Sequence, residues 1–270
     1  MARKPATPAD DAETGDRPGR DNGVQVLARA AEILRLLKSS PGGLSQAEIS
    51  NTLLLARSTV HRILSALAAE GLVEQSGTSS RYRLGQEILR MAEAARSALV
   101  TVIHPLLQSL SRELNETVDL SVLDRNQITF IDQVVAAQRL RTVSVIGASF
   151  PLYCTANGKA VLAAMSEKEL ERVLPPDFEA MTPATLTSLT ALKTDLARVR
   201  KSGVAYDLEE HSLGVCAVGV VLADSPLGYA ALSIPIPVQR FEDKKDAAAA
   251  ALKRTVSLIE TLWRKENGEA

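Results

Sequence analysis

Three consecutive segments in the N-terminal third of the chain carry apolar residues at the three- and four-residue spacing of a helix. They begin at Val24, after Ser45 and at Arg57, and the first one stops at Pro41-Gly42-Gly43. This spacing collects the apolar side chains on one face of each helix. Ser45 and Glu48 also have the S-x-x-E form of a capping box, which marks the start of the second helix. The pattern therefore predicts three helices.

A hairpin and a further helix are predicted next. Two short extended runs, at 72–75 and 81–84, flank the polar segment 76–80, whose composition suits a turn. Three helices followed by a hairpin form the element order of a winged helix-turn-helix. From Gly85 to about Val102 the helical spacing returns, so we expect a helix that links this unit to the rest of the chain.

From His104-Pro105 onward the chain mixes helix-like and strand-like segments. Apolar or alternating runs indicate strands at 118–123, 127–135, 141–146, 215–222 and 229–234. Helical spacing or a capping box indicates helices at 106–114, from Ser166 onward, at 191–201 and at 241–264. Because these helices interleave with strands joined by turns, we predict an α+β fold with a mostly antiparallel sheet.

The domain divisions follow from these patterns. Residues 1–22 carry almost no large apolar side chains, so they cannot offset the entropy of ordering and are expected to form a disordered tail. The other predicted divisions are a winged helix-turn-helix domain at 23–85, a linker helix at 86–102 and a larger domain at 103–265.

Whole-chain composition changes this picture little. The 270 residues suffice for two ordinary domains, and the net charge of −1 does not by itself suggest a polyanionic partner. No apolar stretch approaches the roughly 20 residues needed to span a bilayer, and the only cysteines are Cys154 and Cys216. We therefore expect a cytoplasmic protein with no membrane anchor and no disulfide framework.

Local charge is more informative than net charge. In a helix-turn-helix the second helix of the motif enters the major groove with its N-terminal residues nearest the bases. The predicted third helix places residues there that can bond to bases or phosphates: Arg57, Ser58, Thr59, His61 and Arg62. Arg81 and Arg83 alternate with Tyr82 on the hairpin and are expected to reach the flanking backbone or minor groove. The predicted partner is double-stranded DNA.

The same residues resemble a known family. The run from Arg57 to Leu64, with Gly71-Leu72-Val73 and Tyr82-Arg83-Leu84-Gly85 after it, is similar to the DNA-binding domain of IclR-type bacterial transcription regulators. The resemblance continues through Pro151-Leu152 with Thr155 to Ala160, and through Gly203 to Gly219. It implies a GAF-like effector-binding domain at 103–265. It also implies a homodimer or homotetramer on a palindromic operator.

The resemblance also implies an effector pocket. Its lining is expected to comprise Gly147, Ala148, Leu152, Asp207, Val215, Cys216, Ala217 and Ser233. Backbone amides at Gly147 and Ala148 can approach a carboxylate closely, and Ser233 can donate to it. The expected effector is an organic or aromatic acid that controls a metabolic or catabolic operon. Ala217 after Cys216 departs from relatives that take small oxoacids, which speaks against an effector like glyoxylate or pyruvate.

The cysteines and His211 could also form two other kinds of site, a catalytic site or a metal site. Cys154 or Cys216 with His211 as base would make a thiol-dependent enzyme with an accessory winged helix. Asp207, His211 and a cysteine would make a metal site, but no C-x-x-C or H-x-x-x-H pair sets a ligand spacing. A cysteine in an apolar strand is more often a small buried hydrophobe. We therefore expect no catalytic residues, no metal and no cofactor.

Overall fold

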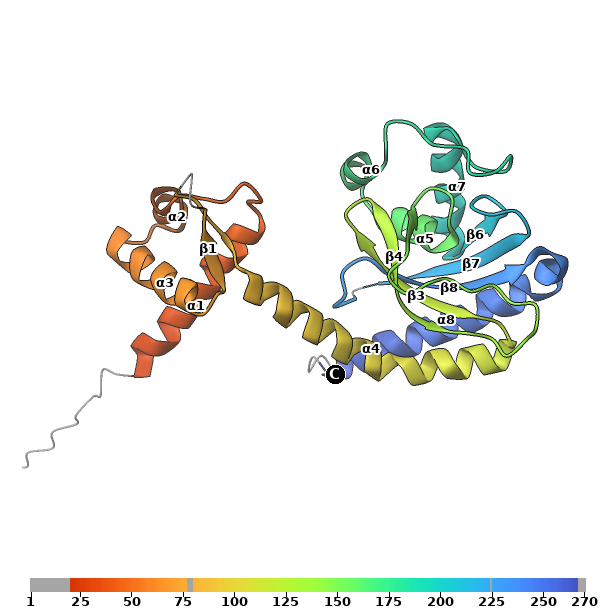
Figure 1. The fold of residues 1–270 in the computed structure, drawn as a ribbon, viewed down its shortest axis with the longest axis horizontal. Helices are drawn as coiled ribbons and strands as arrows, with labels where there is room; N and C mark the ends of the chain where they lie inside the picture. The colour runs from red at the N-terminus through yellow and green to blue at the C-terminus, as the bar shows by residue number, and fades with distance from the viewer. Residues whose placement is uncertain (1–19, 77–79, 224, 267–270) are drawn as a thin grey trace, which may run out of the picture. The chain divides into compact units, whose positions relative to one another are not determined.

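The computed structural model describes residues 20–76, 80–223 and 225–266. The chain divides into two units between Ala94 and Ala95, within helix α4 (Gln86–Leu114). Figure 1 shows the elements of both units. Most of the tail predicted at 1–22 lies outside the described residues, and its last three residues belong to α1 (Arg20–Lys38). Part of the predicted hairpin turn, 77–79, also lies outside them.

The N-terminal unit has the predicted winged helix-turn-helix order. After α1 come α2 (Gln46–Leu53), α3 (Arg57–Ala69), β1 (Val73–Gln75) and β2 (Tyr82–Leu84). The capping box forms at the start of α2, where the Ser45 amide donates to Glu48 Oε2 at 2.7 Å. The buried faces of the helices and of β1 share one core: Ile33, Leu37, Ile49, Val60, Ile63, Leu64, Leu67 and Val73.

The hairpin returns tightly against the end of α3. A Cβ added at Gly85 would lie 2.1 Å from the carbonyl oxygen of Gly71, so only glycine fits after β2. Leu44 forms a bridge to Tyr82 of β2, and this bridge joins the loop before α2 to the hairpin. These contacts set the position of the wing relative to α2 and α3.

The C-terminal unit is built on one six-stranded sheet in which every neighbouring pair is antiparallel. Its order is β5-β4-β3-β8-β7-β6. The strands are β3 (Val118–Asp124), β4 (Gln127–Val134), β5 (Ser149–Pro151), β6 (Ala205–Leu208), β7 (Val215–Leu222) and β8 (Ala230–Pro237). The predicted α+β fold is confirmed.

Helices cover both faces of this sheet (Figure 1). On one face, α4 and the long α8 (Phe241–Glu266) enclose the larger core, and the short 3-10 turn η1 (Val238–Arg240) leads into α8. On the other face lie α5 (Ala156–Ala164), α6 (Glu167–Val173) and α7 (Leu189–Ser202), with a second core. Among the described residues, no helix is long and apolar enough to cross a membrane.

Helix α4 does not stop where the sequence predicts. The predicted linker helix at 86–102 and the predicted helix at 106–114 are one helix that passes through Pro105. A proline inside a helix removes one backbone hydrogen bond and costs about 3 kcal/mol. Ile103 and Leu107 flank it and are both fully buried in the larger core. Tertiary packing on both sides of Pro105 therefore holds the helix together.

The prediction of a strand at 141–146 is wrong as well. Residues 141–145 form no regular element, Ile146 begins a turn, and the segment pairs with no strand in the described part of the chain. Thr142 and Ser144 are half-buried between exposed neighbours. Side chains at the start of β3 and just before it hold the segment instead. Thr117 Oγ1 donates to the Thr142 carbonyl at 2.7 Å, and Asp119 of β3 accepts from Ser144 Oγ at 2.9 Å. We call residues 141–146 the strap.

Candidate functional site

Helix α3 presents a polar face above a buried one. Arg57, Ser58, His61 and Arg62 are exposed and Thr59 is partly exposed. The opposite face belongs to the core of the N-terminal unit. Gln46 of α2 donates to the Arg57 carbonyl at 2.9 Å and so fixes the start of α3 against α2. All five predicted residues of α3 thus lie together on one accessible surface at its N-terminal half.

The two arginines of the wing differ. Arg83 is exposed, as predicted. Arg81 is engaged within the unit, since its Nε donates to the Gly43 carbonyl and a terminal nitrogen contacts Glu48 Oε1, both at 3.0 Å. Its guanidinium therefore braces the wing against the cap of α2, while the side chain stays 37% exposed. Arg83 is the more exposed of the two arginines.

A cavity of about 270 Å³ lies in the C-terminal unit between the sheet, the start of α5 and the strap. Four of the eight predicted effector residues line it: Asp207, Val215, Ala217 and Ser233. The other lining residues are Asp119, Phe130, Thr142, Val143, Ser144, Phe150, Thr155, Ala156, Asn157, His211, Ser212 and Pro235. Loops and strands far apart in sequence thus build one site.

The other four predicted residues are not part of the lining. The amides of Gly147 and Ala148 donate to the carbonyls of Phe130 and Val145, so they are not available to a carboxylate. Leu152 packs in the second core. Cys216 faces the larger core, because side chains alternate along β7 and its neighbours Val215 and Ala217 face the cavity.

Two buried carboxyl groups dominate the polar lining of the cavity. Asp119 is 1% exposed and accepts from Gln133 at 2.6 Å and from Ser144. Burial raises its pKa to about 6, against the effect of these two hydrogen bonds. Burial also raises the pKa of Asp207 to about 7, although its Oδ1 accepts from the Glu210 amide. Burial therefore favours the protonated form of Asp207 more than that of an exposed carboxyl.

The chemistry of the thiols does not fit a nucleophile. Burial raises the pKa of Cys154 to about 12 and that of Cys216 to about 11, so both hold their proton at neutral pH. Burial also lowers the pKa of His211, whose Nδ1 contacts Ser212 and whose ring stacks on Phe150. No group of three or more metal-ligating side chains occurs among the residues that the structure describes.

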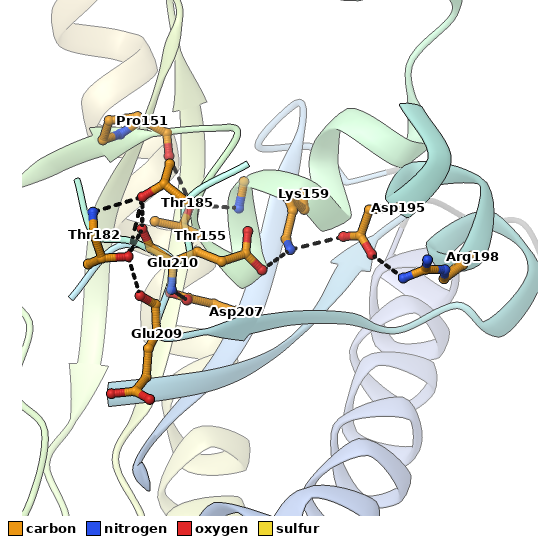
Figure 2. A network of polar contacts seen from close by, with 11 residues as sticks. Pro151, Thr155, Lys159, Thr182, Thr185, Asp195, Arg198, Asp207, Glu209 and Glu210 are labelled. Atoms are coloured by element: carbon orange, nitrogen blue, oxygen red, sulfur yellow. Dashed lines mark hydrogen bonds and ion pairs between the residues drawn. The ribbon is translucent and has the colours of Figure 1, made fainter. Parts of the chain in front are cut away.

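A buried lysine anchors the loop that follows Asp207 of β6 and carries His211. Lys159 of α5 is 1% exposed, and its Nζ contacts Glu210 Oε1 at 2.5 Å and Asp195 Oδ2 at 2.9 Å. Figure 2 shows these contacts together with Thr185, whose hydroxyl donates to the Glu210 carbonyl at 2.6 Å. The side chain and the backbone carbonyl of Glu210 thereby both hold the loop in place.

A β-bulge connects the cavity to helix α4. Leu120 pairs with Asp132 and Ser121 pairs with Phe130, so Ile131 is an extra residue in β4. Phe130 lines the cavity, whereas Ile131 packs against the core beneath α4 and α8.

The extra residue changes which way the next two side chains point. Asp132 also lies on the α4 side, where its Oδ2 is 2.7 Å from His104 Nδ1. Gln133 is turned back to the cavity side and donates to Asp119. Neighbouring residues of β4 thus contact the cavity and α4.

Comparison with known proteins identifies the family of both units. Residues 26–77 match the model of the IclR helix-turn-helix domain, and residues 91–261 match the model of the bacterial transcriptional regulator IclR C-terminal domain. The chain belongs to the IclR family. The α3 surface lies in the first IclR match and the cavity in the second.

Individual members of the IclR family are similar over most of the chain. The HTH-type transcriptional regulator Rv1719 of Mycobacterium tuberculosis is 52% identical over 241 residues, which cover 89% of this chain and 93% of that protein. The crystal structure of the Thermotoga maritima IclR is 30% identical with a TM-score of 0.58, over 88% of this chain and 98% of that one.

One solved IclR homologue has a bound small molecule. This protein, from Microbacterium hydrocarbonoxydans, is in complex with 4-hydroxybenzoate; it is 22% identical with a TM-score of 0.58, over 87% of this chain and 98% of that one. At this identity the likeness concerns the fold.

Proposed function

We propose that this protein regulates transcription of a metabolic or catabolic operon by binding operator DNA through α3 and the wing. A small-molecule effector in the cavity of the C-terminal unit changes that binding. The observation that carries the proposal is the α3 surface, where two arginines and three small or polar side chains are gathered above an intact core. These residue types bond to phosphates and base edges in the major groove.

A homodimer or homotetramer fits this function. Dimers place two recognition helices about one DNA turn apart, which matches a palindromic operator. Exposed apolar side chains on α1 and α4 support such contacts between copies: Val24, Leu27, Leu89 and Met91.

Binding to the protein's own upstream promoter tests the proposal. We expect tight binding in a fluorescence anisotropy titration, falling steeply as salt is raised because arginines displace counterions from phosphates. Scrambled DNA of the same length is the control and is expected to bind at least about 10³-fold more weakly. Equal, weak binding to both DNAs, with and without a metabolite mixture, would contradict the proposal.

We further propose that the bulge in β4 carries the effector's influence to α4. An effector regulates only if it binds more tightly to one arrangement of the protein than to another. Asp119 lines the cavity and is bonded to Gln133, and the adjacent Asp132 is bonded to His104 of α4. A ligand that moves Asp119 therefore acts on a strand position that is directly attached to the helix entering the DNA-binding unit.

The variant His104→Ala tests this route. We expect it to reduce the effector-induced change in promoter affinity at least about threefold, using an effector found by screening metabolites for promoter release. Effector affinity itself, measured by calorimetry, is expected to change less than about twofold because His104 does not line the cavity. Ser109→Ala, on the exposed face of the same helix, is the control. An unchanged response in His104→Ala would refute the route.

The size of the cavity suits a small metabolite. Binding sites for drug-sized ligands usually measure about 300–1,000 Å³. At about 270 Å³, this cavity is slightly smaller. The complex of the Microbacterium hydrocarbonoxydans homologue with 4-hydroxybenzoate supports a ligand with one ring.

A further inference from the structure

We infer that the cavity takes an uncharged single-ring aromatic compound carrying a hydroxyl or amino donor, and discriminates against the ionised carboxylate of the same size. This inference rests on the proposed function, since it names the ligand class of the proposed effector cavity. It differs from the organic or aromatic acid expected from the sequence.

The aromatic ring is indicated by the wall of the cavity. Phe130 and Phe150 meet edge to face with ring centroids 5.2 Å apart, and Phe150 stacks on His211 at 4.2 Å. All three rings line the cavity. Aromatic side chains favour stacked or edge-to-face contacts with a further ring. A cavity of about 150 Å³ already holds benzene, so about 270 Å³ accommodates one ring with a substituent and little more.

The discrimination against a carboxylate follows from the charges. Two acidic side chains, Asp119 and Asp207, line the cavity, and the described lining residues include no lysine or arginine. The nearest buried cation in this network, Lys159, is engaged by Glu210 and Asp195 and is not part of the lining. An ionised acid would therefore enter a site that already holds like charge, without a cation to offset the desolvation of its own charge.

A hydroxyl group suits these carboxyls in either protonation state. It donates to an ionised carboxylate and accepts from a protonated one. Burial places the pKa of Asp119 at about 6 and that of Asp207 at about 7, so both states are accessible near neutral pH. An ionised ligand carboxylate can only accept, so it matches a protonated partner alone. A phenol or an aniline thus suits the site in both protonation states, whereas benzoate suits only the protonated one.

Phenol and benzoate are the matched probes. We expect phenol to bind the full-length protein at least about tenfold more tightly than benzoate in calorimetric titrations at pH 7. Aniline is expected to behave like phenol, because its amino group is an uncharged donor. Equal or tighter binding of benzoate, or no measurable binding of phenol and aniline at millimolar concentration, would overturn the inference.

Isosteric variants test whether the two carboxyl groups cause the preference for phenol over benzoate. Replacing both, Asp119→Asn with Asp207→Asn, removes the like charge and is expected to narrow the phenol-to-benzoate ratio at least about threefold. Asp124→Asn, an exposed change of the same kind at the end of β3, is the control and is expected to leave the ratio unchanged. Should the double variant fail to fold, each single variant is expected to narrow the ratio in part. An unchanged ratio in folded variants would refute the assignment of these two residues.

Promoter binding separates this inference from the proposed function. A protein that binds its promoter and releases it with benzoate, and not with phenol, retains the proposed function and overturns the ligand class. A protein that binds phenol but shows no preference for its promoter contradicts the proposed function and supports the ligand class.

Discussion

Alanine at both Arg57 and Arg62 is expected to weaken promoter binding about a hundredfold or more while leaving the fold intact. Each arginine that bonds to a base is worth about 1–3 kcal/mol, and each phosphate contact adds to the salt dependence. Both side chains are exposed on α3, so their removal disturbs no buried contact of Val60 or Ile63. Fluorescence anisotropy across a salt series measures the loss, and circular dichroism checks the fold.

A control with the same change in charge makes this result specific. Lys168→Ala with Arg172→Ala removes two positive charges from exposed positions of α6, a helix of the C-terminal unit. We expect this control to bind the promoter within about twofold of the parent protein. If both double variants lost affinity equally, net charge and not the α3 surface would explain the binding.

Replacing Lys159 with methionine is expected to destabilise the C-terminal unit by about 3–5 kcal/mol. Methionine keeps most of the volume of the side chain but leaves the buried Glu210 carboxylate without its cation (Figure 2). Removing one partner of a buried ion pair typically costs this much because the other charge stays desolvated. Urea unfolding, followed by circular dichroism, measures the free energy of unfolding.

Two further variants test the reason for that loss. Lys193→Met breaks an ion pair with Glu167 in which both side chains are largely exposed, and we expect little change in stability. Adding Glu210→Gln to Lys159→Met removes the unpaired charge and is expected to recover part of the lost stability. A Lys159→Met protein as stable as Lys193→Met would show that burial of the pair is not the source of the stabilisation.

Helix α3 and its surface could be predicted from sequence because local pattern decides both. The spacing of the apolar residues sets which face of the helix is buried, and the residues outside that face are left exposed to solvent. Arg57, Ser58, His61 and Arg62 are therefore exposed in the structure as in the prediction. Arg81 differs because its partners, Glu48 and Gly43, are distant in sequence and meet it only when the hairpin folds back.

The cavity could be predicted only in part because it is lined by segments that tertiary packing brings together. Successive side chains of a strand point to opposite faces, so the three residues 215–217 cannot all face one cavity. This alternation alone excludes Cys216 from the lining. Asp119 could have been found from the sequence, since it is a charged residue between the apolar Val118 and Leu120. The strap, with its half-buried Thr142 and Ser144, has the alternation of a strand but finds no strand to pair with among the described residues.

The bulge in β4 also bears on how such a sensor changes over evolutionary time. Because Asp132 and Gln133 face opposite sides of the sheet, substitutions around the cavity can accumulate without touching the attachment to His104. The range of ligands that the cavity binds can therefore change while the contact between Asp132 and His104 is kept. Losing the extra residue Ile131 would also keep this separation, because plain alternation from Phe130 still turns Asp132 to the α4 side and Gln133 to the cavity side. At this position we therefore expect both substitutions and the loss of a single residue to be tolerated in descendants.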